Sequence, residues 1–142
     1  MDSTRSFVLD GSVTIAWGFE DETDEYAAAI LRRMPDLRAC VPSLWPLEVA
    51  NAPLVGERRR RITPAERSRF LGILSIFPIT IDDQTVAHAW AGTINLARAH
   101  NLTSYDASYL DLAIQLGLPL ATLDARLKKA AKAIGVPIFV LA

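Results

Sequence analysis

The fold of this chain is decided by residues 103–127, which read TSYDASYLDLAIQLGLPLATLDARL. The first half is an apolar run that ends at Gly117, a residue suited to the C-terminal cap of a helix, and a proline follows two residues later. A short apolar segment, 120–123, then has the composition of a buried strand. Asp124 suits the N-cap of another helix, as Asp106 suits the first turn of the preceding one. The stretch therefore predicts a helix, a strand and a second helix, with an acid at the start of each helix.

Length and composition predict a single domain that spans residues 1–142. Hydrophobic residues make up 51% of it, enough for a sizeable core, yet no apolar run is long enough to cross a membrane. The N-terminus lacks the pattern of a signal peptide, and the single cysteine, Cys40, cannot form an internal disulfide, so we expect a cytoplasmic location.

Charge is distributed unevenly along the chain. The net charge of −1 gives no overall attraction to nucleic acid. Six of the fifteen Lys and Arg residues are nevertheless arginines between Arg58 and Arg69. Contact with RNA and simple solvation are both open interpretations of this arginine cluster.

Short apolar segments alternate with helix-like segments along the whole chain. Strands are expected at 7–9, 38–41, 78–81, 120–123 and 137–141. Nearly continuous apolar strands separated by helices are typical of a parallel sheet covered on both faces. We therefore predict an α/β protein, a three-layer α/β/α sandwich whose central, mostly parallel sheet has five strands.

Two early helices can be placed from their capping residues. Ser12 is a candidate N-cap for a brief helix over 13–19. Ser43 is a candidate N-cap for a longer helix, in which Pro53 is expected to cause a kink or a restart near Ala50 because an interior proline removes a backbone hydrogen bond.

Two later helices have clearer starts. Residues 63–66, Thr-Pro-Ala-Glu, form a capping-box pattern. Another long helix is expected to start at 82–83. Its predicted inward stripe consists of Val86, Trp90, Thr93, Ala97 and His100.

Four acids are expected to meet at one edge of the sheet. Asp10 directly follows the first strand and Asp124 follows the fourth, at the carboxyl ends where α/β sheets place their sites. Glu48 and Asp106 lie early in helices that should begin near the same edge. Helix capping alone, worth about 1 kcal/mol, accounts for Asp106 and Asp124 taken singly. It does not account for the other two, so the pattern favours one shared acidic site.

Converging carboxylates point to a hard divalent cation, which relieves their mutual repulsion. The sequence offers no Cys/His spacing suited to zinc, and no serine or cysteine nucleophile with a matching histidine. Mg²⁺ is the expected ion, with Mn²⁺ as an alternative. Metal-assisted hydrolysis of a phosphodiester, with water as the nucleophile, is the chemistry that these residue types support.

Four segments carry a resemblance to a known family: residues 8–13 (VLDGSV), 47–51 (LEVAN), 104–109 (SYDASY) and 121–126 (ATLDAR). In order and spacing they resemble the motifs of PIN-domain proteins, and most closely those of the VapC toxins of type II toxin–antitoxin pairs. The resemblance covers essentially the whole chain. It implies a Mg²⁺-dependent endoribonuclease that cuts RNA, is neutralised by a cognate antitoxin, and usually forms a homodimer. No membrane association is expected, because the sequence has no apolar run long enough to cross a membrane.

The resemblance also assigns roles to individual residues. The family's acidic cluster of catalytic and metal-binding residues corresponds to Asp10, Glu48, Asp106 and Asp124. Its supporting polar positions correspond to Ser12, Asn51 and Thr122. Asp111 matches no family acid, and Pro53 departs from the helix-forming residue expected after the glutamate motif.

Three alternatives to a toxin nuclease remain open. One is an RNA-processing PIN nuclease that is not a toxin. Another is a degenerate PIN fold that binds only a partner protein. The third is a receiver-like signalling domain, since Asp82 and Asp83 follow the third strand, although Asp10 lacks the acidic neighbour that such a domain requires.

Overall fold

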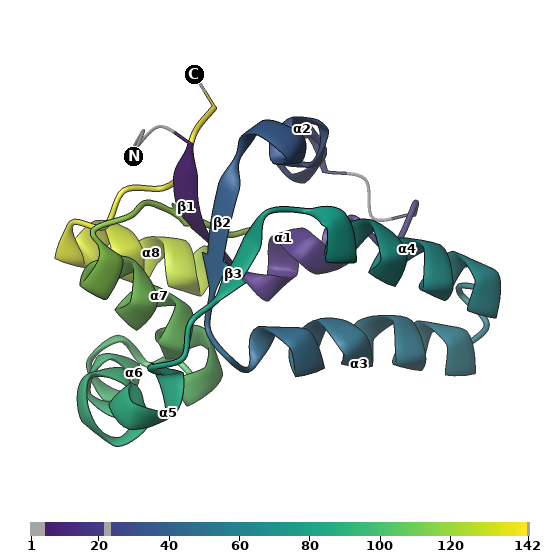
Figure 1. Cartoon of the computed structure of the whole chain (residues 1–142). Coiled ribbons are helices and arrows are strands. Elements are labelled where there is room, and N and C mark those ends of the chain that lie inside the picture. The colour runs from purple at the N-terminus through teal and green to yellow at the C-terminus, as the bar shows by residue number, and fades with distance from the viewer. Residues whose placement is uncertain (1–4, 22–23, 142) are drawn as a thin grey trace.

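The computed structural model describes residues 5–21 and 24–141, which form a parallel sheet flanked by helices (Figure 1). The strands are β1 (Ser6–Leu9), β2 (Arg38–Val41), β3 (Ile79–Ile81) and β4 (Leu120–Ala121). The helices are α1 (Gly11–Ala16), α2 (Glu25–Arg33), α3 (Trp45–Arg58), α4 (Pro64–Ile76), α5 (Thr85–His88), α6 (Ile94–His100), α7 (Ser104–Leu116) and α8 (Ala125–Ile134). A 3₁₀ turn, Met34–Asp36, follows α2, and a π-helical turn, Ala89–Thr93, joins α5 to α6.

The strand order β3-β2-β1-β4 contains a topological switch point between β1 and β4. All neighbouring strands are parallel, and β1 lies inside the sheet between β2 and β4, with Phe7, Val8 and Leu9 fully buried. The chain passes outward from β1 to β3 and then returns to the opposite side of β1. Ligands of open α/β sheets bind at such a switch point, beyond the carboxyl ends of the strands. The residues after β1 and β4 therefore border the expected site.

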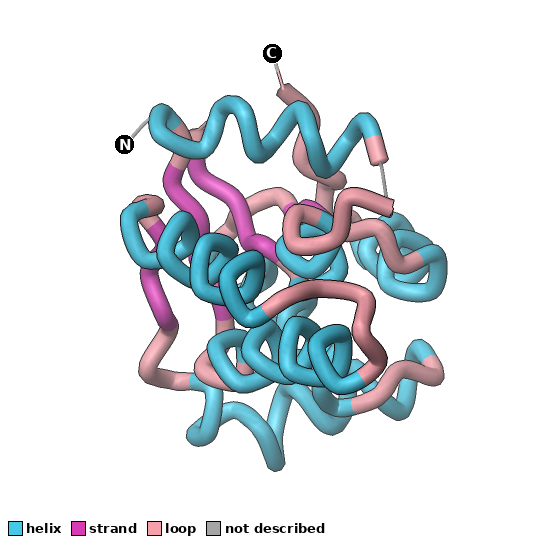
Figure 2. Tube along the Cα trace, turned by 90° about the vertical axis from the view of Figure 1, so that its right-hand side faces the viewer, coloured by secondary structure: helices cyan, strands magenta, loops and turns pink. Residues whose placement is uncertain are grey.

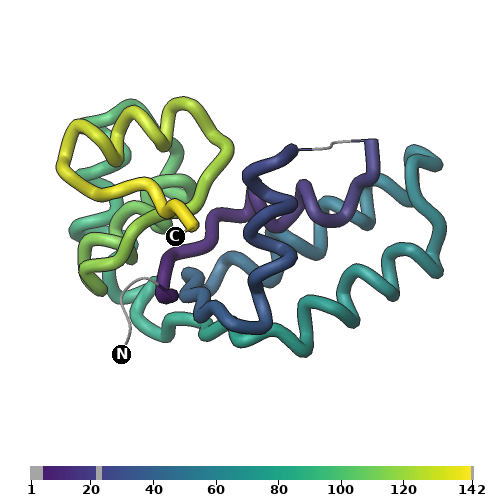
Figure 3. Tube along the Cα trace, turned by 90° about the horizontal axis from the view of Figure 1, so that it is seen from above, coloured from purple at the N-terminus to yellow at the C-terminus, as the bar shows by residue number. Residues whose placement is uncertain are grey.

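Helices cover the sheet from two sides. Figure 3 shows α3 and α4 (teal) on one side of β1 and β2, and α7 and α8 (green to yellow) on the other. Figure 2 shows helices (cyan) above and beside the strands (magenta). This arrangement confirms the predicted parallel α/β sheet flanked by helices. Within the described segments, none of the helices combines the length and the apolar character needed to span a membrane.

The prediction of a fifth strand at 137–141 is wrong, because the sheet has four strands. This segment makes a single parallel bridge, Leu120 to Ile138. Two hydrogen bonds hold it, from the Leu120 N–H to the Pro137 carbonyl and from the Phe139 N–H to the Leu120 carbonyl. β4 is two residues long because the chain turns after Ala121 toward the cap of α8, so no longer ladder can form.

The expected caps of the first and third helices are also wrong. Asp10, in extended conformation after β1, is the N-cap of α1, so Ser12 lies inside that helix. Leu44 rather than Ser43 is the N-cap of α3. Helix α3 continues through Pro53 without the restart expected near Ala50. The capping box of α4 is confirmed: the Glu66 N–H donates to the Thr63 hydroxyl and the Glu66 carboxylate accepts from the Thr63 N–H.

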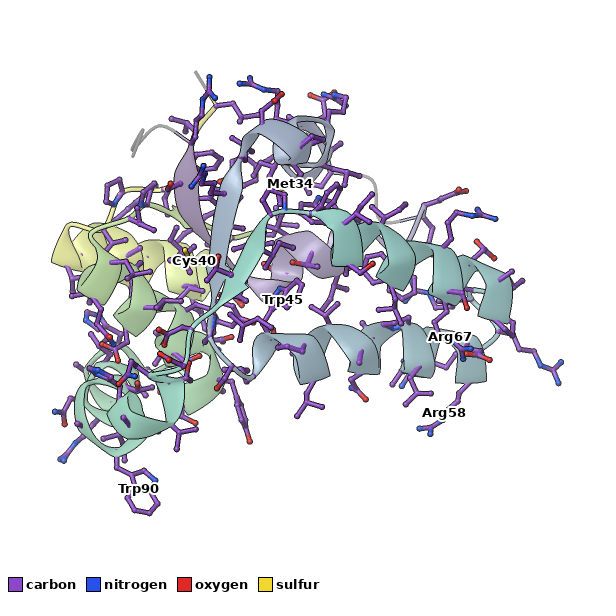
Figure 4. The ribbon with its side chains drawn as sticks, viewed as in Figure 1. Met34, Cys40, Trp45, Arg58, Arg67 and Trp90 are labelled. Atoms are coloured by element: carbon purple, nitrogen blue, oxygen red, sulfur yellow. The ribbon has the colours of Figure 1, made fainter. Side chains whose placement is uncertain are left out.

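The predicted inward stripe of the 82–100 helix is wrong for its first two members. The side chains of Val86 and Trp90 are 81% and 93% exposed, and Figure 4 shows Trp90 pointing away from the ribbon. Thr93 is buried as expected. The π-helical turn between α5 and α6 adds residues to one turn, so a stripe with a period of 3.6 cannot stay on one face across it.

Candidate active site

Asp10 directly follows β1 at the switch point, and the residue is 3% exposed. Its Oδ2 accepts hydrogen bonds from Ser12 Oγ at 2.6 Å and from Thr122 Oγ1 at 2.7 Å. The N–H of Asp10 donates to the Ala121 carbonyl, which fixes the end of β1 beside the end of β4. Both hydroxyls bond to Oδ2, so Oδ1 has no hydrogen-bond donor among the described residues and remains available to a ligand.

Glu48 approaches Asp10 from the first turn of α3. Its Oε1 accepts a hydrogen bond of 2.9 Å from the hydroxyl of Tyr109, a fully buried residue of α7. The carboxylate lies directly against Gly11, since a Cβ at that glycine would stand 1.9 Å from Glu48 Oε1 and 3.4 Å from the Tyr109 hydroxyl. The glycine after Asp10 therefore creates the space in which the glutamate approaches it.

Asp106 and Asp124 complete the group from the N-termini of α7 and α8. The N-cap of α7 is Thr103, whose hydroxyl accepts from the Asp106 N–H at 3.1 Å. Asp124 is the N-cap of α8, and its Oδ1 accepts from the Leu127 N–H at 2.9 Å. The Asp124 N–H donates to Thr122 Oγ1, so one threonine connects two of the acids.

The four carboxylates are close enough to act on one another electrostatically. Burial raises the pKa of Asp10, and the charges of Asp106 and Asp124 raise it further, against the two hydroxyl hydrogen bonds that lower it. Burial likewise raises the pKa of Glu48, with added contributions from the Asp10 and Asp106 charges and an opposing one from the Tyr109 hydroxyl. The pKa of Asp106 is raised by burial and then by the Asp124 charge. A positive charge placed among them would be stabilised by all four.

The chemistry of these donors fits a magnesium ion that keeps part of its water shell. Within residues 5–21 and 24–141, no three His, Cys, Asp or Glu side chains are arranged so that they could hold one ion directly. Mg²⁺ dehydrates reluctantly and is commonly bound through one or two carboxylates plus waters, whereas structural Zn²⁺ needs four close protein ligands. An all-oxygen group with the free Oδ1 of Asp10 therefore fits hydrated Mg²⁺ better than zinc.

The three supporting residues expected from sequence differ in their placement. Ser12 and Thr122 bond the Asp10 carboxylate, and Ser12 Oγ also accepts from the Leu123 N–H at 3.0 Å. Asn51 is exposed and has no side-chain hydrogen bond to another described residue. The structure thus connects two of the three to the acids.

Sequence reasoning missed two residues that shape the site, Gly11 and Tyr109. Tyr109 lies three residues after Asp106 and hence on the same side of α7, a spacing that could have indicated a shared role. The importance of Gly11 could not be inferred locally, because its neighbour Glu48 is 37 positions away in the chain.

Asp111 lies apart from the four acids, as its position in the sequence predicts. It is 7% exposed, and its Oδ2 accepts hydrogen bonds from Thr93 Oγ1 at 2.9 Å and from Gln115 Nε2 at 3.1 Å. The carboxylate also stands close to Gly92, where a Cβ would lie 3.1 Å from Oδ1. Asp111 therefore anchors the π-helical turn to α7.

The raised pKa of Asp10 predicts a particular pH dependence of stability. In EDTA, the folded chain holds the Asp10 proton more tightly than the unfolded chain, so the contribution of Asp10 to the free energy of unfolding falls as pH rises above about 4, through the window between the unfolded and the folded pKa. The asparagine side chain in Asp10→Asn does not ionise, so this variant does not lose stability in that way. Its stability relative to the unsubstituted protein should therefore increase from pH 4 to pH 7 in urea unfolding, and parallel pH profiles for the two proteins would contradict the prediction. Mg²⁺ should reduce the difference by neutralising the charge.

The comparisons with known proteins identify the family to which the chain belongs. The family model for the PIN domain matches residues 7–133. The chain belongs to the PIN-domain family, which decides against the receiver-like alternative.

Two proteins of Pyrobaculum aerophilum are similar to this chain. The protein named Ribonuclease VapC3 is 30% identical over 130 residues, which is 92% of this chain and 98% of that protein. The crystal structure of PAE2754 aligns with a TM-score of 0.66 and 25% sequence identity, covering 89% of this chain and 85% of the other. The sequence and structure comparisons therefore agree over most of the chain.

Proposed function

We propose that this protein is a Mg²⁺-dependent endoribonuclease that hydrolyses RNA phosphodiesters with water. The observation that carries the proposal is the group of four carboxylates at the switch point, three of them with raised pKa values. The similarity to a protein named as a ribonuclease supports RNA as the substrate. A group of carboxylates without a cation would repel a phosphodiester, so the site requires a bound metal to work on one.

The side chains have separable roles in this proposal. Asp10, Glu48, Asp106 and Asp124 would hold the ion, directly or through water. When bound, the ion lowers the pKa of a coordinated water and offsets the negative charge of the phosphodiester. Ser12 and Thr122 fix the Asp10 carboxylate so that Oδ1 faces the ligand. The Tyr109 hydroxyl orients Glu48, and its own raised pKa keeps it a hydrogen-bond donor at neutral pH.

Metal dependence provides the direct test. Purified protein should cleave single-stranded RNA in Mg²⁺, lose this activity in EDTA and regain it when Mg²⁺ or Mn²⁺ is added back. Isothermal titration should detect Mg²⁺ binding to the unsubstituted protein. Cleavage that persists in EDTA would overturn the proposed chemistry, and absence of both Mg²⁺ binding and cleavage would favour a PIN fold that only binds a partner.

We also propose a toxin role with a cognate antitoxin, which the likeness to the protein named Ribonuclease VapC3 supports and which separates this proposal from a general RNA-processing nuclease. The neighbouring gene tests it: an adjacent small reading frame for a DNA-binding protein, whose product binds this chain and inhibits cleavage, is expected for a toxin. If no such product inhibits cleavage, the result would favour an RNA-processing nuclease that is not a toxin.

We also propose a homodimer. The exposed apolar residues around the π-helical turn support a contact there, since Trp90 is 93% and Val86 81% exposed, with Ile94 at 51%. Sedimentation should show a dimer that Trp90→Ser weakens, and a monomer at all concentrations would refute this contact.

A further inference from the structure

A cationic pocket lies beside the acidic site, between the C-terminal end of α6 and the first half of α8. Its volume is about 430 Å³, and its polar lining comes from His100, Asn101, Arg126 and Lys129. The remaining lining is alanine, with no acidic side chain. This pocket is separate from the carboxylates described above and has no role in the chemistry assigned to them.

No carboxylate in the described part of the chain pairs with the two cations of the pocket. Among the described residues, Arg126 and Lys129 form neither an ion pair nor a side-chain hydrogen bond. By contrast, Arg61 bonds both oxygens of Asp21, and Arg67 pairs with Glu57. The two pocket cations are therefore available to an anionic ligand.

Residues in both walls of the pocket lie close in sequence to two of the acids, Asp124 and Asp106. Arg126 is two residues after Asp124 in the sequence. Lys129 lies three residues after Arg126, on the same side of α8 as Arg126 and about 7.5 Å along the helix from Asp124. On the opposite wall, Asn101 is the C-cap of α6 and comes two residues before Thr103, the N-cap of the helix that carries Asp106. A strand cut at the acids can thus continue into the pocket.

A phosphate is the ligand that this lining suits best. An arginine fork donates two parallel hydrogen bonds to phosphate oxygens, and a lysine adds a compact positive charge. Neither a large apolar groove nor an aromatic wall is present in the lining, so a bound helix or a stacked base is not favoured. Two cations beside the acids would also offset the repulsion between the acidic site and the RNA backbone.

We propose that the pocket between α6 and α8 binds a backbone phosphate of the RNA, adjacent to the scissile bond. This inference rests on the proposed nuclease function and deepens it by assigning a substrate subsite. It predicts that substrate affinity depends on Arg126 and Lys129, whereas the carboxylates provide the cleavage.

The test measures binding of a short single-stranded RNA in EDTA, without cleavage, between 50 and 200 mM salt. For Arg126→Gln/Lys129→Gln, the dissociation constant should rise roughly tenfold, and the slope of log K against log salt should shrink by about 1.4 because two phosphate-contacting cations are lost. The matched control is Arg32→Gln/Arg33→Gln, which removes the same charge from the last turn of α2, ahead of the amino end of β2 and outside the arginine cluster. It should leave affinity and slope close to those of the unsubstituted protein.

An unchanged salt slope in the Arg126→Gln/Lys129→Gln protein, or equal losses in both double variants, would overturn the subsite. So would unchanged RNA binding with lost affinity for a polyglutamate peptide, which would indicate an acidic protein segment as the ligand. These outcomes are independent of the nuclease proposal, whose failure would appear as absent Mg²⁺-dependent cleavage in the unsubstituted protein.

Discussion

Asp106→Asn is expected to lower RNA cleavage in Mg²⁺ by about 10³-fold while the protein remains folded, the loss typical of removing one group that stabilises charge in a transition state. The substitution keeps the size of the side chain and leaves the Thr103 cap intact, because that cap bonds the backbone N–H of residue 106. It also removes the repulsion between Asp106 and Asp124. The free energy of unfolding in EDTA should therefore change by no more than about 1 kcal/mol.

Thermal unfolding supplies a measurement of this variant that does not depend on catalysis. A ligand that binds only the folded state raises its stability by RT ln(1 + [L]/Kd), so Mg²⁺ should raise the Tm of the unsubstituted protein. The same addition should raise the Tm of Asp106→Asn much less. An equal Mg²⁺-induced shift in both proteins, or retained cleavage, would remove Asp106 from the site.

Asp111→Asn is the matched control, since it makes the same chemical change five residues along α7. Asp111 lies outside the carboxylate group and bonds Thr93 and Gln115. Its substitution should cost about 1 kcal/mol of stability through weaker hydrogen bonds to a formerly charged acceptor. Cleavage should stay within about twofold of the unsubstituted protein, because the control does not alter the acids.

Local sequence rules were sufficient for much of the fold. The caps at Thr63 and Asp124, and the left-handed helix end at Gly117, depend on residues within one turn of each boundary. The acids after β1 and β4 could be brought together from topology alone, because parallel strands end at a common edge. Such features require no knowledge of side-chain packing.

The errors arose where distant segments decide the outcome. The stripe that included Trp90 failed because a π-helical turn changed the period within the helix, and the sequence carries no residue that marks such a turn. The segment after Pro137 looked like a strand, but its partner β4 was too short to extend the sheet. The packing of Glu48 against Gly11 likewise depends on how α3 docks onto α1.

Gly11→Ala is expected to reduce cleavage by about 10²-fold, although the new methyl group touches no substrate. A Cβ at this position would overlap Glu48 Oε1 at 1.9 Å, so the glutamate must rotate away and lose its hydrogen bond to Tyr109. Displacement of a catalytic group by about 1 Å is sufficient for a loss of this size. The RNA cleavage rate in Mg²⁺ is the measurement.

Stability should respond weakly to the same change, which separates a positioning defect from unfolding. Alanine is favoured over glycine in a helix by about 1 kcal/mol, and this gain offsets a lost side-chain hydrogen bond of similar size. Gly72→Ala in α4 is the matched control, because a Cβ there meets no atom within 4 Å. It should raise stability by about 0.5–1 kcal/mol without changing cleavage.

A second substitution identifies Glu48 as the group that moves. In the Gly11→Ala background, Glu48→Asp shortens the side chain by one methylene and relieves the overlap, so the two changes should be non-additive, with part of the cleavage recovered. Glu48→Asp alone should lower cleavage, since the shorter carboxylate withdraws from Tyr109. Full activity in Gly11→Ala, or strictly additive losses, would mean that the contact between Gly11 and Glu48 does not set the geometry of the acidic site.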